Sequence, residues 1–174
     1  MSDLHEPEIT VKTNLDVATR KFIPDPNGRE IGYDGRRGSY GEWEIQKVHN
    51  LMTTAGRDFL HQQGYATSGL GANGGNYIAL TTDATAASAA DTTLTGEIVT
   101  TGLERAQGAV THVAGNTTST ISKTFTATGT HTSVQKCALF TAASAGTMLH
   151  EATFVAASLL SNDQIAITWT VTLS

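Results

Sequence analysis

Three histidines and three glutamates in the second half of the chain are the residue types best suited to acid-base or metal chemistry. They are His112, His131, His150, Glu97, Glu104 and Glu151. None of them falls into a recognisable ligand spacing, such as paired histidines four residues apart on a helix. A zinc or calcium site would therefore depend on a coincidence of the tertiary fold. We interpret these residues as surface or hydrogen-bonded strand residues, and we expect no metal and no cofactor.

The sequence offers little support for catalysis. A glycoside hydrolase needs two carboxylates across a groove, and Glu97 with Glu104 is the one suggestive pair. Their spacing of seven residues places them on opposite faces of a strand, so the pair fails unless a bulge intervenes. Serine, histidine and aspartate are present, but the nucleophile-elbow pattern is not. The sequence predicts no catalytic residues and a protein that is not an enzyme.

Two glycine-rich stretches invite comparison with phosphate loops. Arg36 and Arg37 stand between glycines without the spacing of a P-loop, which favours a solvated turn or a salt-bridged arm. The glycines at 69, 71, 74 and 75 precede a strand, whereas phosphate binding needs glycines after a strand and before a helix. Nucleotide binding is therefore not expected.

Charge divides the chain into two unequal parts. The formal net charge is −5 and the pI is near 5.6, which gives no electrostatic reason to expect a nucleic acid or an anionic membrane as partner. Residues 1–60 hold 8 of the 11 Lys and Arg and 10 of the 16 Asp and Glu. The remainder is weakly charged and rich in Thr, Ala, Gly and Ser, a composition typical of a surface that neighbours cover.

A soluble protein made in a cytoplasm is expected. The longest apolar runs are far shorter than the roughly 20 residues of a membrane span. Residues 1–10 carry acids where a signal peptide would carry bases. Cys137 is the only cysteine and lies in an apolar stretch, so an intramolecular disulfide is impossible and a buried, inert thiol is expected.

The clearest structural signal is the stretch 163–173. Ile165, Ile167 and Trp169 fall on one side of an extended chain and threonines on the other, as in a half-buried strand. Further strands are expected at the regular spacing of a sandwich, over about 76–81, 97–105, 108–114, 118–128, 133–141 and 147–156. The prediction is a mainly β protein with an antiparallel, jelly-roll-like β-sandwich at residues 66–174, which buries Phe154 and Trp169.

Residues 1–65 are expected to lie outside that sandwich. Residues 1–43 show no sustained period and contain all three prolines, so we expect an extended N-terminal arm over residues 1–45. Residues 46–65 carry apolar side chains at helical spacing and are expected to form a short helical segment. Deleting residues 1–45 should then leave a folded sandwich. The expected partner-binding residues of the arm are Phe22, Ile23, Arg29, Tyr33, Arg36, Arg37, Tyr40 and Trp43.

Several short motifs between residues 50 and 174 resemble a known class of proteins. They are Asn76-Tyr-Ile-Ala-Leu-Thr-Thr-Asp83, Ala90-Asp-Thr-Thr-Leu-Thr-Gly-Glu-Ile98, Gly102-Leu-Glu-Arg-Ala106, Cys137-Ala-Leu-Phe140, Ala143-Ser-Ala-Gly-Thr-Met148 and the Trp-bearing last strand. Together they are similar to small β-sandwich virion proteins of tailed bacteriophages, of the capsid-decoration or tail-fibre and collar type. The chain departs from that pattern at Ala138 and Ala145, where the pattern has glycine. Both departures concern turn and packing geometry.

The resemblance implies a non-enzymatic structural protein of the virion, assembled in the host bacterial cytoplasm. Because the chain combines a compact body with a charged arm, we favour a decoration or cement protein that binds the major capsid protein. The alternative is a tail, neck or fibre-anchoring component, and a homo-oligomer is expected. A carbohydrate-binding β-sandwich module is the second alternative, with Tyr65 and Tyr77 as the best candidates for a sugar platform.

Overall fold

The computed structural model describes residues 11–24, 38–56, 74–113 and 116–173, and the structural statements below concern these residues. Most of them form strands, the others lie in turns and loops, and one helical turn spans 54–56. The strands are β1 (Val11–Arg20), β2 (Phe22–Pro24), β3 (Gly38–Tyr40), β4 (Glu44–His49), β5 (Leu51–Met52), β6 (Tyr77–Thr81), β7 (Ala106–Gln107), β8 (Ala109–His112), β9 (Thr118–Thr126), β10 (His131–Phe140), β11 (Met148–Leu159) and β12 (Gln164–Leu173).

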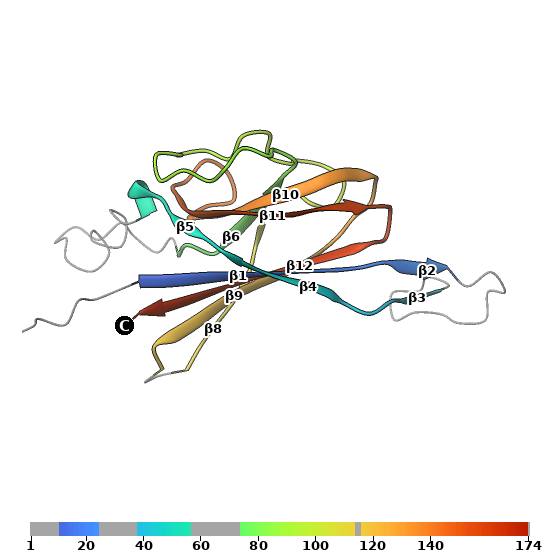
Figure 1. Ribbon diagram of the computed structural model, residues 1–174, viewed down its shortest axis with the longest axis horizontal. Coiled ribbons are helices and arrows are strands. Elements are labelled where there is room, and N and C mark those ends of the chain that lie inside the picture. Colours follow the sequence, from blue (N-terminus) through green and yellow to red (C-terminus); the bar gives the residue numbers. More distant parts are fainter. Residues whose placement is uncertain (1–10, 25–37, 57–73, 114–115, 174) are drawn as a thin grey trace, which may run out of the picture.

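Two five-stranded sheets pack face to face (Figure 1). The first sheet has the strand order β4-β1-β12-β9-β8, and the second has the order β5-β11-β10-β6-β7. Strands β2 and β3 pair with each other in a separate ribbon. All of these pairings are antiparallel. The predicted antiparallel β-sandwich is confirmed.

The core lies between the two sheets and takes one side of each long strand. Its buried members are Leu15, Val17, Ile121, Phe125, Ile165, Ile167 and Trp169 from the first sheet, Ile78, Leu80, Val134, Cys137, Leu139, Ala152, Phe154 and Leu159 from the second, and Leu103 and Ala127 from connecting segments. The alternation of β12 turns its isoleucines and Trp169 inward and its threonines outward. The predicted burial of Trp169, Phe154 and Cys137 is confirmed. Burial raises the pKa of the Cys137 thiol, which keeps the sulfur protonated and unreactive.

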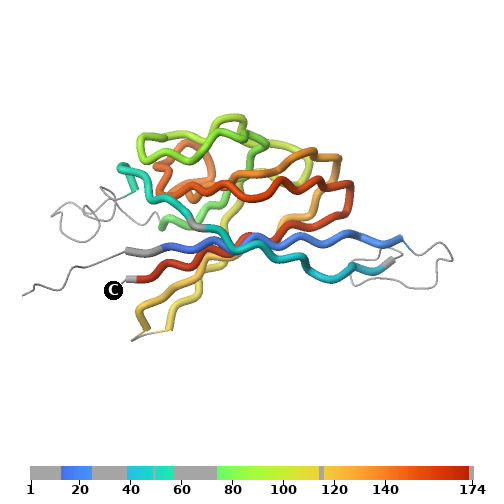
Figure 2. The backbone as a smooth tube through the Cα atoms, in the orientation of Figure 1, coloured from blue at the N-terminus to red at the C-terminus, as the bar shows by residue number. Residues whose placement is uncertain are grey.

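Two continuous stretches pass from one sheet to the other and form the sides of the sandwich. Figure 2 shows the first of them, where the chain of β4 runs on into β5 with only Asn50 between the strands. The second joins β7 to β8 through Gly108 alone. A Cβ atom at position 108 would lie 2.7 Å from Ile121 Cγ2 and 3.2 Å from Ile78 Cδ1, which belong to different sheets. This corner therefore needs glycine, because the backbone approaches both layers closely.

The segment from residue 82 to residue 105 lies over the outer face of the second sheet (Figure 1). Leu94 from this segment packs with Phe140 and Met148 in a second, smaller apolar cluster. The Thr81 hydroxyl at the end of β6 donates hydrogen bonds of 2.7 and 2.9 Å to the carbonyls of residues 95 and 96. One face of the second sheet is thus covered by the chain itself.

The strand expected at 97–105 is a wrong prediction. Only an isolated bridge between Thr81 and Glu97 forms there, and turns follow it. The backbone has positive φ at Gly96, Thr101 and Gly102, which interrupts any extended run. The other expected strands are present with shifted ends, as β6, β8, β9, β10, β11 and β12.

The expectation that the N-terminal arm lies outside the sandwich is wrong for β1. This strand lies between β4 and β12 in the first sheet, and Leu15 pairs with Trp169 and with Val48. Leu15 and Val17 are fully buried in the core. Deleting residues 1–45 would therefore remove a central strand and part of the core, so the deletion cannot leave the sandwich intact. The sandwich includes residues 11–20 and 44–52 as well as the C-terminal strands.

The helical segment expected at 46–65 is also wrong over residues 46–52. These residues form β4 and β5, and the described helix is limited to the turn at 54–56. Val48 packs against the core from β4, and Thr53 is fully buried, where its hydroxyl donates to the carbonyl of Met148 at 2.6 Å. Pairing of β4 with β1 along six residues overrides the local helical spacing. Residues 57–65 lie outside the described residues.

Candidate interaction site on the β2–β3 ribbon

A two-stranded ribbon extends from one end of the first sheet (Figure 1). It arises because β1 continues into β2 after a single residue, Lys21, while β3 leads into β4. The ribbon pairs Phe22 with Tyr40 and Ile23 with Ser39. At its base the amide of Gly41 donates to the carbonyl of Lys21 at 2.9 Å. We call residues 20–24 and 38–43 the ribbon site.

The base of the ribbon site is built around the guanidinium of Arg20. Its carbon lies 4.1 Å from the ring centroid of Tyr40 and 4.4 Å from that of Trp43, distances at which a cation and an aromatic ring attract. Phe22 meets Tyr40 edge to face, with ring centroids 5.5 Å apart. Nε and Nη2 of Arg20 both donate to Oε1 of Gln164 on β12, at 2.9 and 2.8 Å. The aromatic rings are therefore fixed to the sandwich through one arginine.

A second anchor of the ribbon is Asp163, in the turn between β11 and β12. Its buried carboxylate accepts hydrogen bonds from Lys21 Nζ at 2.8 Å, from the Phe22 amide at 2.9 Å and from the Leu160 amide at 2.9 Å. Burial alone would raise the pKa of Asp163, but the hydrogen bonds from Lys21, Leu160 and Phe22 outweigh it and lower the pKa. The ionised carboxylate thus holds the start of β2 against the sandwich.

The outer part of the ribbon site exposes apolar surface. Ile23 is 54% exposed, and Pro24 beside it is exposed as well. Lys21 contributes a side chain that is 58% exposed although its ammonium is paired with Asp163. Exposed apolar side chains beside a base that charged and aromatic contacts fix are an arrangement suited to binding another protein.

The structure brings together four of the eight residues expected to bind a partner. Phe22, Ile23, Tyr40 and Trp43 all belong to the ribbon site. The other four, Arg29, Tyr33, Arg36 and Arg37, lie outside the described residues. Sequence reasoning missed the four residues that fix the ribbon to the sandwich, which are Arg20, Lys21, Asp163 and Gln164. Their contacts join positions far apart in the chain, and no local pattern marks them.

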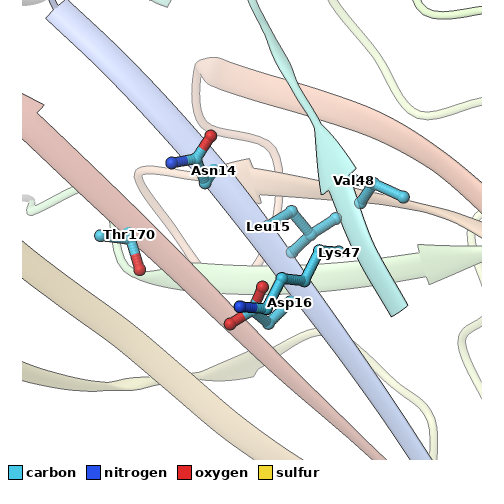
Figure 3. Close-up of a pocket in the computed structure, with 6 residues that line it drawn as sticks. All are labelled: Asn14, Leu15, Asp16, Lys47, Val48 and Thr170. Carbon is cyan, nitrogen blue, oxygen red and sulfur yellow. The ribbon is translucent and has the colours of Figure 1, made fainter. Parts of the chain in front are cut away.

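A pocket lies on the first sheet, between β1, β4 and β12. Its volume is about 320 Å³, and it is lined by Asn14, Leu15, Asp16, Lys47, Val48 and Thr170 (Figure 3). This lining is mostly polar and contains no aromatic side chain that could stack on a sugar ring. Tyr77, expected as part of a sugar platform, packs instead against the smaller apolar cluster, and Tyr65 lies outside the described residues. The pocket therefore gives no support to a carbohydrate site.

The histidines and glutamates of the second half of the chain are dispersed over the structure. His112 contacts the carbonyl of Thr118, and His131 contacts Thr101. Glu97 forms a salt bridge with Arg105. His150 is buried beside Trp169, with ring centroids 5.8 Å apart, and burial lowers its pKa to about 4. Across the described ranges, no three His, Cys, Asp or Glu side chains converge as metal ligands would.

Comparison with known proteins identifies no relative of this chain. No family model matches the sequence, and no curated protein or solved structure matches it significantly. Among the residues that the structure describes, no helix has the length and apolar character needed to cross a membrane. The ribbon site therefore rests on its own geometry.

Proposed function

We propose that the protein is a non-enzymatic structural protein of a tailed-phage virion that attaches to neighbouring subunits through the ribbon site. The observation that carries this proposal is a ribbon extending beyond the sandwich, with exposed Ile23 and Pro24 at its outer part and Arg20 and Asp163 fixing its base. A rigid base lowers the ordering cost of binding. The motif resemblance to phage β-sandwich proteins supplies the virion context.

Within the particle, we favour a decoration or cement protein on the capsid exterior, with the major capsid protein as partner. A ribbon that reaches beyond its own sandwich can contact a second subunit while the body rests on the first. A tail, neck or fibre-anchoring position is the alternative. Copy number separates the two by quantitative mass spectrometry of purified virions: hundreds of copies correspond to the capsid, and a few dozen or fewer to the tail or neck.

Replacing the ribbon tests the attachment directly. Because Lys21 and Gly41 are already hydrogen-bonded, residues 22–40 can be exchanged for Asn-Gly, a pair suited to a tight hairpin turn. We expect this variant to keep its β circular dichroism and to lose its association with virions. If the folded variant still sediments with virions as the full chain does, the ribbon is not the attachment site.

A single substitution sharpens the test. Ile23→Ser should weaken attachment by about tenfold, since an exposed apolar side chain at an interface contributes by being buried on binding. Ile45→Ser is the matched control, because Ile45 is 63% exposed on β4 outside the ribbon site. Equal weakening by both substitutions would contradict a specific role for the ribbon.

A further inference from the structure

A lysine lies buried under the segment that covers the second sheet. Lys136 occupies β10 between two neighbouring strands, where it is paired with Thr81 of β6 and Thr153 of β11. Its side chain is only 3% exposed, and its ammonium lies 2.7 Å from Oδ2 of Asp83. Lysine is almost never buried to this extent without a partner. The backbone pairing on both sides fixes the position of the lysine in the sheet. The ion pair then places its side-chain nitrogen against the carboxyl group of Asp83.

That carboxyl group is itself held in one orientation. Asp83 lies two residues beyond the end of β6, and its amide donates to the Thr81 hydroxyl at 3.0 Å. Its second oxygen, Oδ1, accepts hydrogen bonds from the hydroxyl of Thr85 at 2.8 Å and from the amide of Thr85 at 3.3 Å. One oxygen of Asp83 therefore faces the Lys136 nitrogen, while the other is bound by two hydrogen-bond donors.

A second carboxyl group, that of Glu151, is buried on the same face of the sheet. Glu151 lies on β11 opposite Ala138, two residues along β10 from Lys136 and on the same face of the sheet. It is 1% exposed, and its Oε1 accepts the amide of Ser88 at 2.6 Å. Burial raises the pKa of Glu151, a hydrogen bond from Ser88 opposes that shift, and Asp91 adds to it. The positive charge of Lys136 also acts on this carboxyl group.

We propose that Lys136 and Asp83 condense into an intramolecular isopeptide bond, with Glu151 carrying protons between the reacting groups. A proton first moves from the Lys136 ammonium to the Asp83 carboxylate, which gives a neutral amine and a neutral acid. The nitrogen lone pair then attacks Cγ of Asp83 to form a tetrahedral intermediate. Glu151 takes a proton from the nitrogen and delivers one to the departing hydroxyl, so one water leaves as the amide forms. No oxidant, reductant or cofactor is consumed.

The surroundings favour this step in two ways. Fixing amine and acid at contact distance replaces an encounter in solution by an intramolecular reaction, for which effective concentrations of about 10⁵ M or more are reached. The two Thr85 donors at Oδ1 are placed to stabilise negative charge that develops on that oxygen in the intermediate. Hydrogen bonds from Lys136 and Thr85 lower the pKa of Asp83, so the ion pair is the resting form and the initial proton transfer to the neutral, reactive pair is uphill.

The bond would join the start of the covering segment to the middle of β10. Strand β6 and the segment from residue 82 would then stay attached to the second sheet even when hydrogen bonds break. This is a property of the sandwich and does not depend on the ribbon site or on the proposed virion role.

The intact mass of the purified full chain under denaturing conditions decides the matter. We expect it to be lower than the sequence mass by one water molecule, and a protease digest to yield one branched peptide containing both Asp83 and Lys136. Lys136→Arg keeps the charge but should restore the full sequence mass, and Glu151→Gln should keep the Ser88 hydrogen bond and slow or abolish the loss of water. Lys123→Arg on β9 and Glu104→Gln are the matched controls, which should still lose water.

The mass of the wild-type protein alone can contradict the proposal, without any variant. If folded wild-type protein retains the full sequence mass after prolonged incubation, Lys136 and Asp83 form only an ion pair. If water is lost but the branched peptide maps to other residues, the assignment to this pair is wrong. If Glu151→Gln loses water at the wild-type rate, Glu151 has no role in proton transfer.

Discussion

The side-chain amide of Gln46 binds both backbone groups of Val155. Its Oε1 accepts the Val155 amide at 2.9 Å, and its Nε2 donates to the Val155 carbonyl at 3.4 Å. Gln46 lies on β4 of the first sheet, whereas Val155 lies on β11 of the second. Beyond the short pairing with β5, this side of β11 has no strand partner among the described residues. The glutamine side chain therefore binds two backbone groups at an open sheet edge that a neighbouring strand would otherwise bind.

Replacing Gln46 should loosen this edge. Gln46→Ala is expected to lower the free energy of unfolding by about 0.5–1.5 kcal/mol, because two hydrogen bonds are lost at a partly exposed site. Urea unfolding followed by tryptophan fluorescence measures the change. Lys47→Ala, one residue along the same strand, should leave the midpoint nearly unchanged. Equal midpoints for wild type and Gln46→Ala would show that water replaces the side chain without cost.

The corner at Gly108 should not accept a larger residue. Gly108→Ala is expected to destabilise the protein by about 1–3 kcal/mol, because the new methyl group would overlap Ile121. Gly74→Ala is the control, since a Cβ atom there would find its nearest neighbour at 3.9 Å. Thermal unfolding of both variants compares the two sites. A Gly108→Ala protein as stable as the control would mean that the corner relaxes.

Strands β9 and β12 could be predicted because apolar and polar residues alternate along them. In β12 and β9, apolar and hydroxylated residues exchange sides at each step, and one buried face is enough to fix the strand. The same alternation runs through β1 at Leu15 and Val17, but the prolines and glycines that follow it in the sequence favour an extended arm. Among them, Pro24 and Gly38 belong to the β2–β3 ribbon, beyond the end of a core strand.

The candidate site was predictable only in part, since its aromatic residues stand out in a polar segment while their contacts do not. Phe22 and Tyr40 face each other because β2 pairs with β3 across residues 25–37. The stacking of Arg20 and its bonds to Gln164 depend on the pairing of β1 with β12. Long-range pairing of this kind follows from the whole fold and leaves no mark in a short window of sequence.

Asp163 should be the most sensitive carboxylate of the ribbon base. Asp163→Asn is expected to cost about 1–3 kcal/mol at neutral pH, because Lys21 loses its partner and buried amides lose a charged acceptor. Since the folded pKa lies below the ordinary value of 3.8, the stabilisation is present above that value and is lost as pH falls through the folded pKa.

Chemical denaturation at pH 7 and at pH 3 measures this dependence. The difference in unfolding free energy between the wild type and Asp163→Asn should be smaller at pH 3 than at pH 7. Glu44→Gln, which changes an exposed acid on β4, is the control, and its unfolding free energy should stay close to that of the wild type at both pH values. If the difference in unfolding free energy is the same at pH 7 and pH 3, the ionised carboxylate of Asp163 is not the source of that difference.

His150 should make the protein less stable in mild acid. The pKa of His150 is about 4 in the folded protein against an ordinary value of 6.5. Between these two pH values, the imidazole is protonated in the unfolded chain and neutral in the folded one. Stability is fully present above pH 6.5 and declines as pH falls toward 4, by at most about 3 kcal/mol. Thr13 and Trp169, which both contact the ring, are neutral.

The slope of unfolding free energy between pH 7.5 and 5 measures this effect. His150→Phe keeps an aromatic ring beside Trp169 and removes the proton site, so its slope should be smaller than that of the wild type. His112→Gln, at an exposed position on β8, should keep the wild-type slope. An unchanged slope in His150→Phe would assign the acid sensitivity to other groups.

The pairing of β1 with β12 also sets an order of events during synthesis. Leu15 faces Trp169 across adjacent strands, although the two residues lie near opposite ends of the described chain. Until residues 164–173 have left the ribosome, β1 lacks one of its two neighbours and its apolar side has no complete core to enter. The first sheet therefore closes only after translation has passed this point, and such distant pairing is a feature of slowly folding β proteins. A growing chain would need protection from aggregation during that interval.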